Sequence, residues 1–594
     1  MKSFLKYTLA TIVGFIIVNL VGMLIIIGVL SAIVASTSKD VTIKDKSVLV
    51  LTLEGEILDR APNDPFSDLE LPGFAGSKKT GLDDIISAIE KAKHEDKIKG
   101  IYLKLSNVSA GFAACEEIRS ALVNFSDESD KFIYAFSETY SQKAYYLASA
   151  ADKVFITPEG MLLFSGLAGE YSFYKNALEK LGVEMQIIRH GKFKAAVEPF
   201  MLDHMSDENR QQVEVYMGSI WNQVINDISN SRNISNEELN RIADMNMTFR
   251  QVDKLYALGL VDSIVYEDQM LDILREKTGT EAKKEINSHT VANMKNVPAK
   301  REGKGLARDK IAVIYAAGEI NMGQATSFGS ESISGPALSR EIRKARQDST
   351  IKAIVFRINS PGGSALASEL IWREIKLASE EKPVVVSMGN LAASGGYYIA
   401  CAADTIVANP STITGSIGVF GMIPNTQQLF EDKLGINTEV VKTNKLSDMP
   451  SLTRRLTSEE RALMQGMVEN VYSTFVNHVA NGRNLTYEQV DQIGQGRVWT
   501  GANALELGLV DVLGDLNDAI EIAKEMAELD YFRLEKLPKQ KDPIEEMLKG
   551  FSTKMRVRAI EKELGEAAKH YYVLENMKTN SGILARMPYG FEID

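Results

Sequence analysis

The chain has 594 residues, 45% of them hydrophobic, and a formal net charge of −12 at pH 7. This length and apolar content predict several folded domains with cores of their own. The acidic balance and the lack of a long Lys/Arg block argue against a nucleic-acid partner. With Cys115 and Cys401 as the only cysteines and six scattered histidines, no disulfide framework, metal or cofactor is expected.

Residues 1–45 are predicted to form a cytoplasmic stub and a transmembrane anchor. Between Thr8 and Ala35 the only strongly polar side chain is Asn19, and about 28 residues can span a bilayer with some tilt. A cleaved signal peptide has an apolar region of only ~7 to 15 residues. Basic residues before this segment and Asp40 after it predict a single-pass inner-membrane protein with a cytoplasmic N-terminus and a periplasmic body.

From Val48 onward, strand-like runs alternate with helical patterns, which predicts an α/β fold with a largely parallel sheet. The strand-like runs of the first part are Val48–Leu53, Gly100–Leu105, Lys131–Phe136 and Lys153–Thr157. The helical patterns between them are Leu82–Lys93, Cys115–Asn124 and Gln142–Ala151.

The same order of segments returns about 250 residues later. The matching pairs are Val48–Ile57 with Ile311–Ile320, Gly100–Leu105 with Ala353–Ile358, Tyr145–Asp152 with Tyr397–Asp404, and Leu258–Asp262 with Leu507–Asp511. Four matches in one order indicate an internal duplication. The predicted units are therefore a first repeat, a polar linker, a second repeat and a C-terminal extension, over residues 46–280, 281–310, 311–530 and 531–594.

A serine among small residues marks a candidate site in the second repeat. Gly389–Tyr398 follows a strand-like run and precedes an apolar helical run, so Ser394 is predicted at a strand-to-helix turn. Such a turn exposes a hydroxyl and aims backbone N–H groups at the group under attack, although a tight-packing turn is the alternative. Superposing Tyr145 on Tyr397 sets Gln142 opposite Ser394, so only the second repeat carries this nucleophile.

A glycine pair in the second repeat is the candidate oxyanion turn. Asn359–Ser364 follows its strand where the first repeat has Ser106–Gly111. Two successive glycines let the backbone approach a substrate closely, so the N–H groups of Gly362, Gly363 and Gly395 are candidate oxyanion donors. A plain turn is the alternative for the glycine pair.

A serine needs a base within hydrogen-bond reach, and no histidine lies in a turn that the repeat would place beside Ser394. A lysine suits the task if burial lowers its pKa from about 10.4 towards about 7 or 8, which requires about 4 kcal/mol. Lys194, among apolar neighbours in Gly191–Pro199, is the candidate, although most lysines are simply solvated.

Four motifs together resemble the signal peptide peptidase A family in its long, duplicated bacterial form: Lys192–Pro199, Asn359–Ser364, Ala393–Tyr398 and Thr414–Val419. The resemblance covers nearly the whole chain, including the anchor. It implies a tandem ClpP/crotonase-like fold and a Ser/Lys dyad, with Ser394 as nucleophile and Lys194 as general base. It also implies that Ser416 hydrogen-bonds and orients the lysine amine, and that a ring-like homotetramer encloses the active sites.

Lys445 is the alternative base. Counting back without gaps from Met205–Arg210 and from its echo Leu456–Arg461 sets Lys194 opposite Lys445. If each nucleophile takes its base from the adjacent repeat, Lys194 serves Ser394.

The sequence thus predicts a membrane-anchored serine endopeptidase that degrades cleaved signal peptides and other extended peptides through an acyl-enzyme. Acyl-CoA chemistry on the same fold is a second hypothesis, but an exported body would be separated from CoA. A catalytically silent membrane scaffold is a third, and labelling by a serine-directed probe would separate it from an enzyme.

Overall fold

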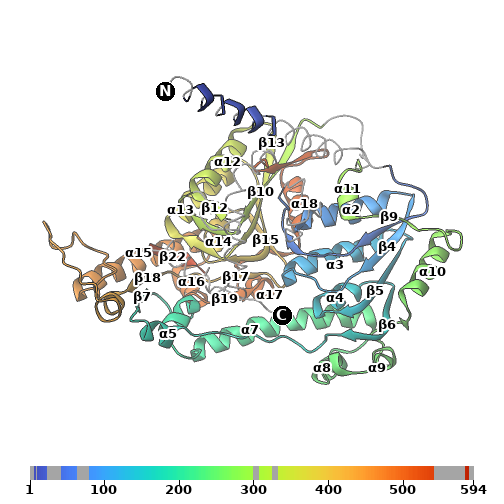
Figure 1. Cartoon of the computed structure of the whole chain (residues 1–594), viewed down its shortest axis with the longest axis horizontal. Coiled ribbons are helices and arrows are strands. Elements are labelled where there is room, and N and C mark those ends of the chain that lie inside the picture. Colours follow the sequence, from blue (N-terminus) through green and yellow to red (C-terminus); the bar gives the residue numbers. More distant parts are fainter. Residues whose placement is uncertain are drawn as a thin grey trace.

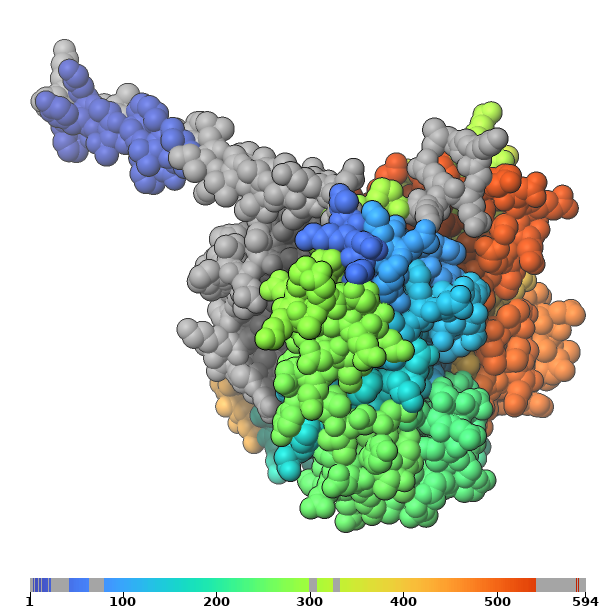
Figure 2. All heavy atoms as spheres, turned by 90° about the vertical axis from the view of Figure 1, so that its right-hand side faces the viewer, coloured from blue at the N-terminus to red at the C-terminus, as the bar shows by residue number. Residues whose placement is uncertain are grey.

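The structure is a computed structural model that describes residues 42–62, 79–298, 307–323, 332–540 and 582–586, with part of a helical segment between residues 4 and 22. This segment stands away from the body of the molecule (Figure 2). The predicted anchor over residues 8–35 lies largely outside the described residues. In the part of the chain that is described, no helix is both long and apolar enough to cross a membrane.

The first repeat is built on a parallel sheet, six-stranded in the described residues, in the order β8-β6-β5-β4-β1-β9. Its strands are β1 (Ser47–Leu51), β4 (Ile98–Lys104), β5 (Phe132–Tyr140), β6 (Lys153–Leu162), β8 (Ser263–Ile264) and β9 (Asn287–His289). Its helices are α2 (Leu82–His94), α3 (Phe112–Asp127), α4 (Gln142–Ala148), α5 (Lys175–Lys180), α6 (Glu198–Met201), α7 (Asp207–Arg232), α8 (Asn236–Asp244), α9 (Val252–Ala257), α10 (Glu267–Thr278) and α11 (Val291–Lys295). The central strands are buried, as their apolar runs predict for a covered parallel sheet.

The second repeat carries the corresponding sheet, in the order β19-β17-β15-β13-β10-β21, with β16 beside β15 and β20 beside β16. These strands are β10 (Lys310–Ala317), β13 (Ile351–Ser360), β15 (Val384–Ala393), β16 (Thr405–Ala408), β17 (Ile413–Gly415), β19 (Val498–Thr500), β20 (Val512–Leu513) and β21 (Arg533–Leu537). The helices are α12 (Gly335–Gln347), α13 (Ala365–Ser379), α14 (Gly395–Ala400), α15 (Ser458–Arg483), α16 (Tyr487–Ile493), α17 (Gly501–Glu506) and α18 (Leu516–Met526). The two repeats lie side by side (Figure 1).

Equivalent contacts recur in both repeats. The Tyr145 hydroxyl donates to the Leu260 carbonyl at 2.8 Å, and the Tyr397 hydroxyl donates to the Leu509 carbonyl at 2.8 Å. Helices α7 and α15 both have 26 residues, and each ends at a left-handed asparagine. The α/β fold and the internal duplication are therefore confirmed.

Two segments outside the predicted repeats complete these sheets. Strand β9 and helix α11 lie within the predicted linker, and β9 pairs with β1. Strand β21 lies within the predicted C-terminal extension and pairs with β10.

A third sheet joins the repeats, in the order β12-β11-β14-β22-β18-β7. Its strands are β7 (Glu184–Arg189), β11 (Glu319–Asn321), β12 (Ser332–Ser334), β14 (Gly362–Ser364), β18 (Phe420–Asn425) and β22 (Gly582–Arg586). Strand β7 belongs to the first repeat but pairs antiparallel with β18 of the second. This pairing carries the chain that follows β7, with Lys194, onto the second repeat.

Candidate active site

Ser394 lies at the turn between β15 and α14, as the sequence predicts. Its backbone has φ 55° and ψ −116°. Residues that carry a side chain rarely adopt this backbone conformation, which costs about 1–3 kcal/mol. The turn is fixed on both sides, because the Ser394 N–H donates to the Gly415 carbonyl at 2.8 Å and its carbonyl accepts from the Tyr398 N–H at 2.8 Å. Such strain persists only where the surroundings over-determine it, which is typical of functional turns.

The side chain of Lys194 reaches Ser394 from the other repeat. Its Nζ lies 2.8 Å from Ser394 Oγ, 3.0 Å from Ser416 Oγ and 3.1 Å from the Ser416 carbonyl oxygen. All three residues are fully buried. Burial alone holds the pKa of Lys194 well below its ordinary value, so the amine is neutral over a wider pH range than a solvated lysine.

The contacts of Ser416 suit a neutral amine. A neutral amine has two N–H groups and one lone pair, and Ser416 offers two acceptors, its hydroxyl and its carbonyl oxygen. The Ser416 hydroxyl has the Gly496 carbonyl within 3.3 Å as an acceptor for its own hydrogen. When Ser416 accepts both N–H groups, the lone pair of Lys194 faces Ser394 Oγ.

Two glycines that sequence reasoning missed pack against the lysine. A Cβ at Gly496, whose φ is 86°, would lie 2.6 Å from the Lys194 Cβ, and a Cβ at Gly418 would lie 3.3 Å from its Cδ. Both glycines therefore leave room for the buried lysine. Single glycines in loops carry no signal that could have singled them out.

The three predicted oxyanion glycines lie around the same turn, but their N–H groups differ. The Gly362 N–H donates to Ser360 Oγ at 3.2 Å. Gly363 pairs with Ile320 of β11 and leaves no room there for a side chain. Gly395 is the first residue of α14, and an N–H in the first turn of a helix has no partner within the helix.

An extended segment of the chain lies beside these glycines. Strand β22 runs antiparallel to β14, with Gly363 opposite Ala585, and antiparallel to β18, with Phe420 opposite Leu584. The Leu584 side chain is buried in an apolar cluster with Leu178, Ile187, Ala196, Val197, Phe200, Phe420 and Met422. An extended strand of this chain therefore lies between β14 and β18 and pairs with both.

At the equivalent position of the first repeat, the Gln142 side chain is held by backbone hydrogen bonds. Gln142 Oε1 accepts from the N–H groups of Ser165 at 3.2 Å and Gly166 at 3.1 Å, and its Nε2 donates to the Gly166 carbonyl at 3.1 Å. Lys445, the alternative base, has an exposed side chain in an ion pair with Glu459. The structure thus places Lys194 at Ser394 and Lys445 at the surface.

Comparison with known proteins shows the family of this chain. The model of Peptidase family S49 matches residues 126–281 and 376–530, once in each repeat. "Protease 4" of Salmonella typhi is 38% identical over 506 residues, which cover 82% of this chain and 80% of that protein. "Serine protease SPPA, chloroplastic" of Arabidopsis thaliana is 35% identical over 492 residues, which cover 82% of this chain and 70% of that protein.

Among solved structures, a ClpP1 mutant from Listeria monocytogenes aligns with 16% identity and a TM-score of 0.24, over 35% of this chain and 94% of that one. The family matches and the relatives define the molecule as a serine peptidase. The chain belongs to peptidase family S49, in the long form that carries the family domain twice.

Proposed function

We propose that the protein is a membrane-anchored serine endopeptidase that degrades cleaved signal peptides and other extended peptides with a Ser/Lys dyad. The observation that carries the proposal is the 2.8 Å contact between the buried Lys194 Nζ and Ser394 Oγ. A low lysine pKa and a strained serine turn at the same place favour a nucleophile with its base over a structural contact.

In this mechanism Ser394 Oγ attacks the carbonyl carbon of the scissile bond while Lys194 Nζ takes the hydroxyl proton. Lys194 then gives this proton to the leaving amine, and an acyl-enzyme on Ser394 remains. A water molecule, deprotonated by the same amine, attacks the acyl-enzyme, and Lys194 then returns the proton to Ser394 Oγ as the acid product leaves. Ser416 keeps the Lys194 nitrogen directed at Ser394 in both its neutral and its protonated form.

The tetrahedral intermediate needs donors for its oxyanion. We assign this role to the backbone N–H groups of Gly395 and of the Gly362–Gly363 turn. Of the three, the Gly362 N–H already donates to Ser360 Oγ and Gly363 is paired with Ile320 and Ala585, so Gly395 carries most of the stabilisation.

The pairing of β22 with β14 and β18 supports an extended peptide as the substrate. Strand β22 binds there through backbone pairing on both of its edges, which is how a strand-like substrate is held without regard to most of its side chains. The apolar cluster around Leu584 suits an apolar side chain of such a substrate. Signal peptides are rich in apolar residues, and a relative from Enterococcus faecium carries the name "Putative signal peptide peptidase SppA".

We further propose an inner-membrane location with the body on the periplasmic side, and two observations support the anchor itself. The apolar run from Thr8 to Ala35 is long enough to span a bilayer. In the described part of the helical segment between residues 4 and 22, the side chains of Phe4, Phe15 and Val18 are exposed to their surroundings. Full-length protein should stay in the membrane after carbonate extraction and a variant lacking residues 1–41 should not; recovery of both in the soluble fraction would contradict the anchor.

A homo-oligomer, which we take to be a tetramer, is supported by an unpaired segment of the second repeat. Residues 181–189 (LGVEMQIIR) end in β7, which pairs with β18, while the equivalent residues 434–442 (LGINTEVVK) form no strand. Leu434, Ile436, Val440 and Val441 are exposed there, on a segment that projects from the body (Figure 1). We propose that this segment pairs with the first repeat of the next copy; Val441→Asp should lower the mass measured by light scattering, and an unchanged mass would contradict this pairing.

The dyad is tested by labelling and by peptide cleavage in the full-length protein. A fluorophosphonate probe should label the wild type and not Ser394→Ala. Lys194→Ala should lose at least ~10³-fold in kcat, because a serine without its base is a poor nucleophile. Lys445→Ala is the matched control and should retain full activity. Activity that survives Lys194→Ala, or folded wild-type protein that takes no label, would overturn the proposal.

A further inference from the structure

Strand β15 is irregular just before the nucleophile. Its partners on β13 run from Ile358 opposite Met388 to Ser360 opposite Ala392. Asn359 alone therefore faces three residues, Gly389–Leu391, which we call the 389–391 bulge. Bulges redirect a strand and are common beside active sites, and this one ends three residues before Ser394.

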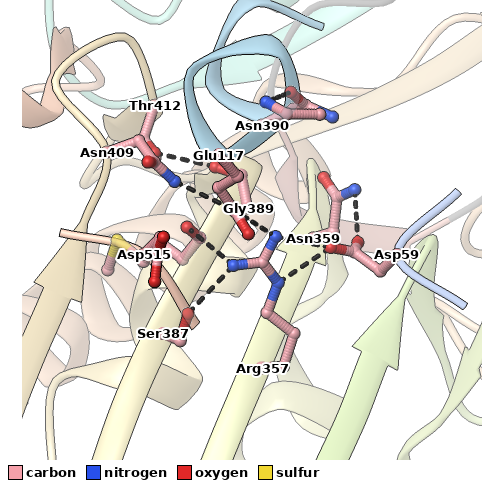
Figure 3. A network of polar contacts seen from close by, with 12 residues as sticks. Asp59, Glu117, Arg357, Asn359, Ser387, Gly389, Asn390, Asn409, Thr412 and Asp515 are labelled. Atoms are coloured by element: carbon pink, nitrogen blue, oxygen red, sulfur yellow. Dashed lines mark hydrogen bonds and ion pairs between the residues drawn. The ribbon is translucent and has the colours of Figure 1, made fainter. Parts of the chain in front are cut away.

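Polar side chains hold the bulge in place within the second repeat. Thr412 Oγ1 donates to the Gly389 carbonyl at 2.8 Å, and Asn359 Oδ1 accepts from the Leu391 N–H at 3.2 Å. Asn359 Nδ2 in turn donates to Asp59 Oδ2 of the first repeat at 2.6 Å. Figure 3 shows the last of these contacts, between Asn359 and Asp59.

Asn390, in the middle of the bulge, binds the first repeat directly. Its Oδ1 accepts from the Ala114 N–H at 2.9 Å, in the first turn of α3. The N-cap residue of this helix is Gly111, which has no side chain with which to cap it. Asn390 therefore supplies from the second repeat the cap that α3 lacks.

The fit between Gly111 and Asn390 is tight. A Cβ at Gly111 would clash with Cγ and Oδ1 of Asn390. The backbone of Gly111, with φ −71° and ψ 163°, suits any residue, so the Asn390 side chain is what demands a glycine there.

Apolar packing also joins the nucleophile strand to the first repeat. Ala393, the neighbour of Ser394, is fully buried in the hydrophobic core of the first repeat, and Leu391 packs against that core. On α3, Glu117 Oε1 accepts from Arg357 Nη2 at 2.7 Å and from Asn409 Nδ2 at 2.9 Å (Figure 3). Helix α3 thus contacts both the strand that carries Ser394 and its neighbours.

We propose that α3 of the first repeat sets the position of the Ser394 hydroxyl through the 389–391 bulge, with Asn390 as the positioning residue. The inference rests on the proposed Ser/Lys dyad. Lys194 also belongs to the first repeat, so one repeat holds both partners of the 2.8 Å contact. A dyad depends on alignment, and a displacement of about 1 Å can cost ~10²-fold in rate.

The test is a set of full-length variants on which kcat, KM and the melting temperature are measured. Asn390→Ala should lower kcat roughly fivefold to tenfold and change KM by less than about twofold, as expected for the loss of one capping bond. Asn390→Asp keeps an acceptor at a helix N-terminus and should restore kcat to within about twofold.

Gly111→Ala disturbs the same contact from the other repeat and should lower kcat roughly tenfold. Its matched control is Gly218→Ala, where a Cβ meets nothing within 4 Å and kcat should stay unchanged. Because the clash requires the Asn390 amide, Gly111→Ala in an Asn390→Ala background should cost little more than Asn390→Ala alone.

A melting temperature that falls while kcat stays at the wild-type value would show a purely structural cap and overturn the inference. Strictly additive effects of Gly111→Ala and Asn390→Ala would do the same. Wild-type protein without serine labelling would overturn the proposed dyad and this inference together, whereas active wild type with unaffected variants would overturn this inference alone.

Discussion

Ser394 and Gln142 occupy matching positions in the two repeats: Ser394 directly precedes α14, and Gln142 is the first residue of α4. In the second repeat the turn is strained, buried and in contact with a lysine, whereas in the first the glutamine side chain hydrogen-bonds to residues 165 and 166. The first repeat instead contributes Lys194 and the helix that supports the nucleophile strand. After duplication, one copy supplies the candidate nucleophile and the other holds it.

The same contrast appears one strand away. Arg357 of β13 is buried between Asp59 and Glu117, with Nη2 2.7 Å from a carboxylate oxygen of each, while the equivalent Lys104 of β4 is partly exposed and pairs with Glu267. Both acidic partners of Arg357 come from the first repeat. The same strand position therefore carries an exposed charge in the first repeat and a charge buried between the repeats in the second.

The largest effect is expected from removing the buried charge of Arg357. Arg357→Met leaves two carboxylates buried without their cation and should lower the free energy of unfolding by about 3–5 kcal/mol, as measured by urea denaturation. The matched Lys104→Met should cost less than about 1 kcal/mol, because its ion pair is exposed. Equal losses in the two variants would contradict the contrast between the strands.

The pH dependence of the Arg357→Met loss follows from the same geometry. Burial raises the pKa of Glu117 to about 7 even though Arg357 lowers it, so without Arg357 the pKa rises further above its unfolded value. The folded variant then binds more protons than the unfolded chain above pH ~4.5, and stability falls as pH rises. The loss should therefore be larger at pH 8 than at pH 6.

A smaller effect is expected from removing strand β22. Because β22 lies along β14 and β18, a peptide substrate competes with it, and removing residues 582–594 should lower KM about twofold to tenfold with kcat unchanged. The milder variant Arg586→Glu, which breaks the ion pair with Glu319, should change KM in the same direction. A fall in kcat would mean instead that β22 supports the site.

The sequence predicted the duplication and the residues of the candidate site, because both rest on local patterns. Aligning the two repeats sets Gln142 opposite Ser394. The resemblance to a known family points to Lys194 and Ser416. The bond between Asn390 and α3 spans 276 residues, and that between Arg357 and Asp59 spans 298, so no periodicity or spacing marks them. Strand β7 is not among the predicted strand-like runs, and its partner in the other repeat could not be predicted either, since strand pairing depends on how the repeats pack.

A modest gain in stability is expected from removing the buried amine. Burial lowers the pKa of Lys194 below that of an unfolded lysine, so between the two values the unfolded chain binds one more proton. The free energy of unfolding therefore rises with pH through this window, and the lysine costs most stability at its acid end. Lys194→Met should raise stability by about 1 kcal/mol near neutral pH, with a smaller gain at pH 9.

Calorimetry at the two pH values measures this gain. Lys445→Met is the control, and because that side chain is exposed its effect should stay within about 0.5 kcal/mol at both. A destabilised Lys194→Met would mean that the contacts with Ser394 and Ser416 outweigh the burial of the amine.

The smallest effect is expected from giving the first repeat its missing serine. Gln142→Ser should change kcat by less than about twofold and lower stability by less than about 1 kcal/mol, because water can reach the N–H of the exposed Ser165 once the glutamine is gone. In a Ser394→Ala background it should restore neither labelling nor cleavage. A serine at residue 142 gains no buried amine, since the candidate counterpart Lys445 is exposed beside Glu459. Labelling at residue 142 would show that the two turns differ by one side chain alone, and the support described for Ser394 would then be unnecessary for a reactive serine.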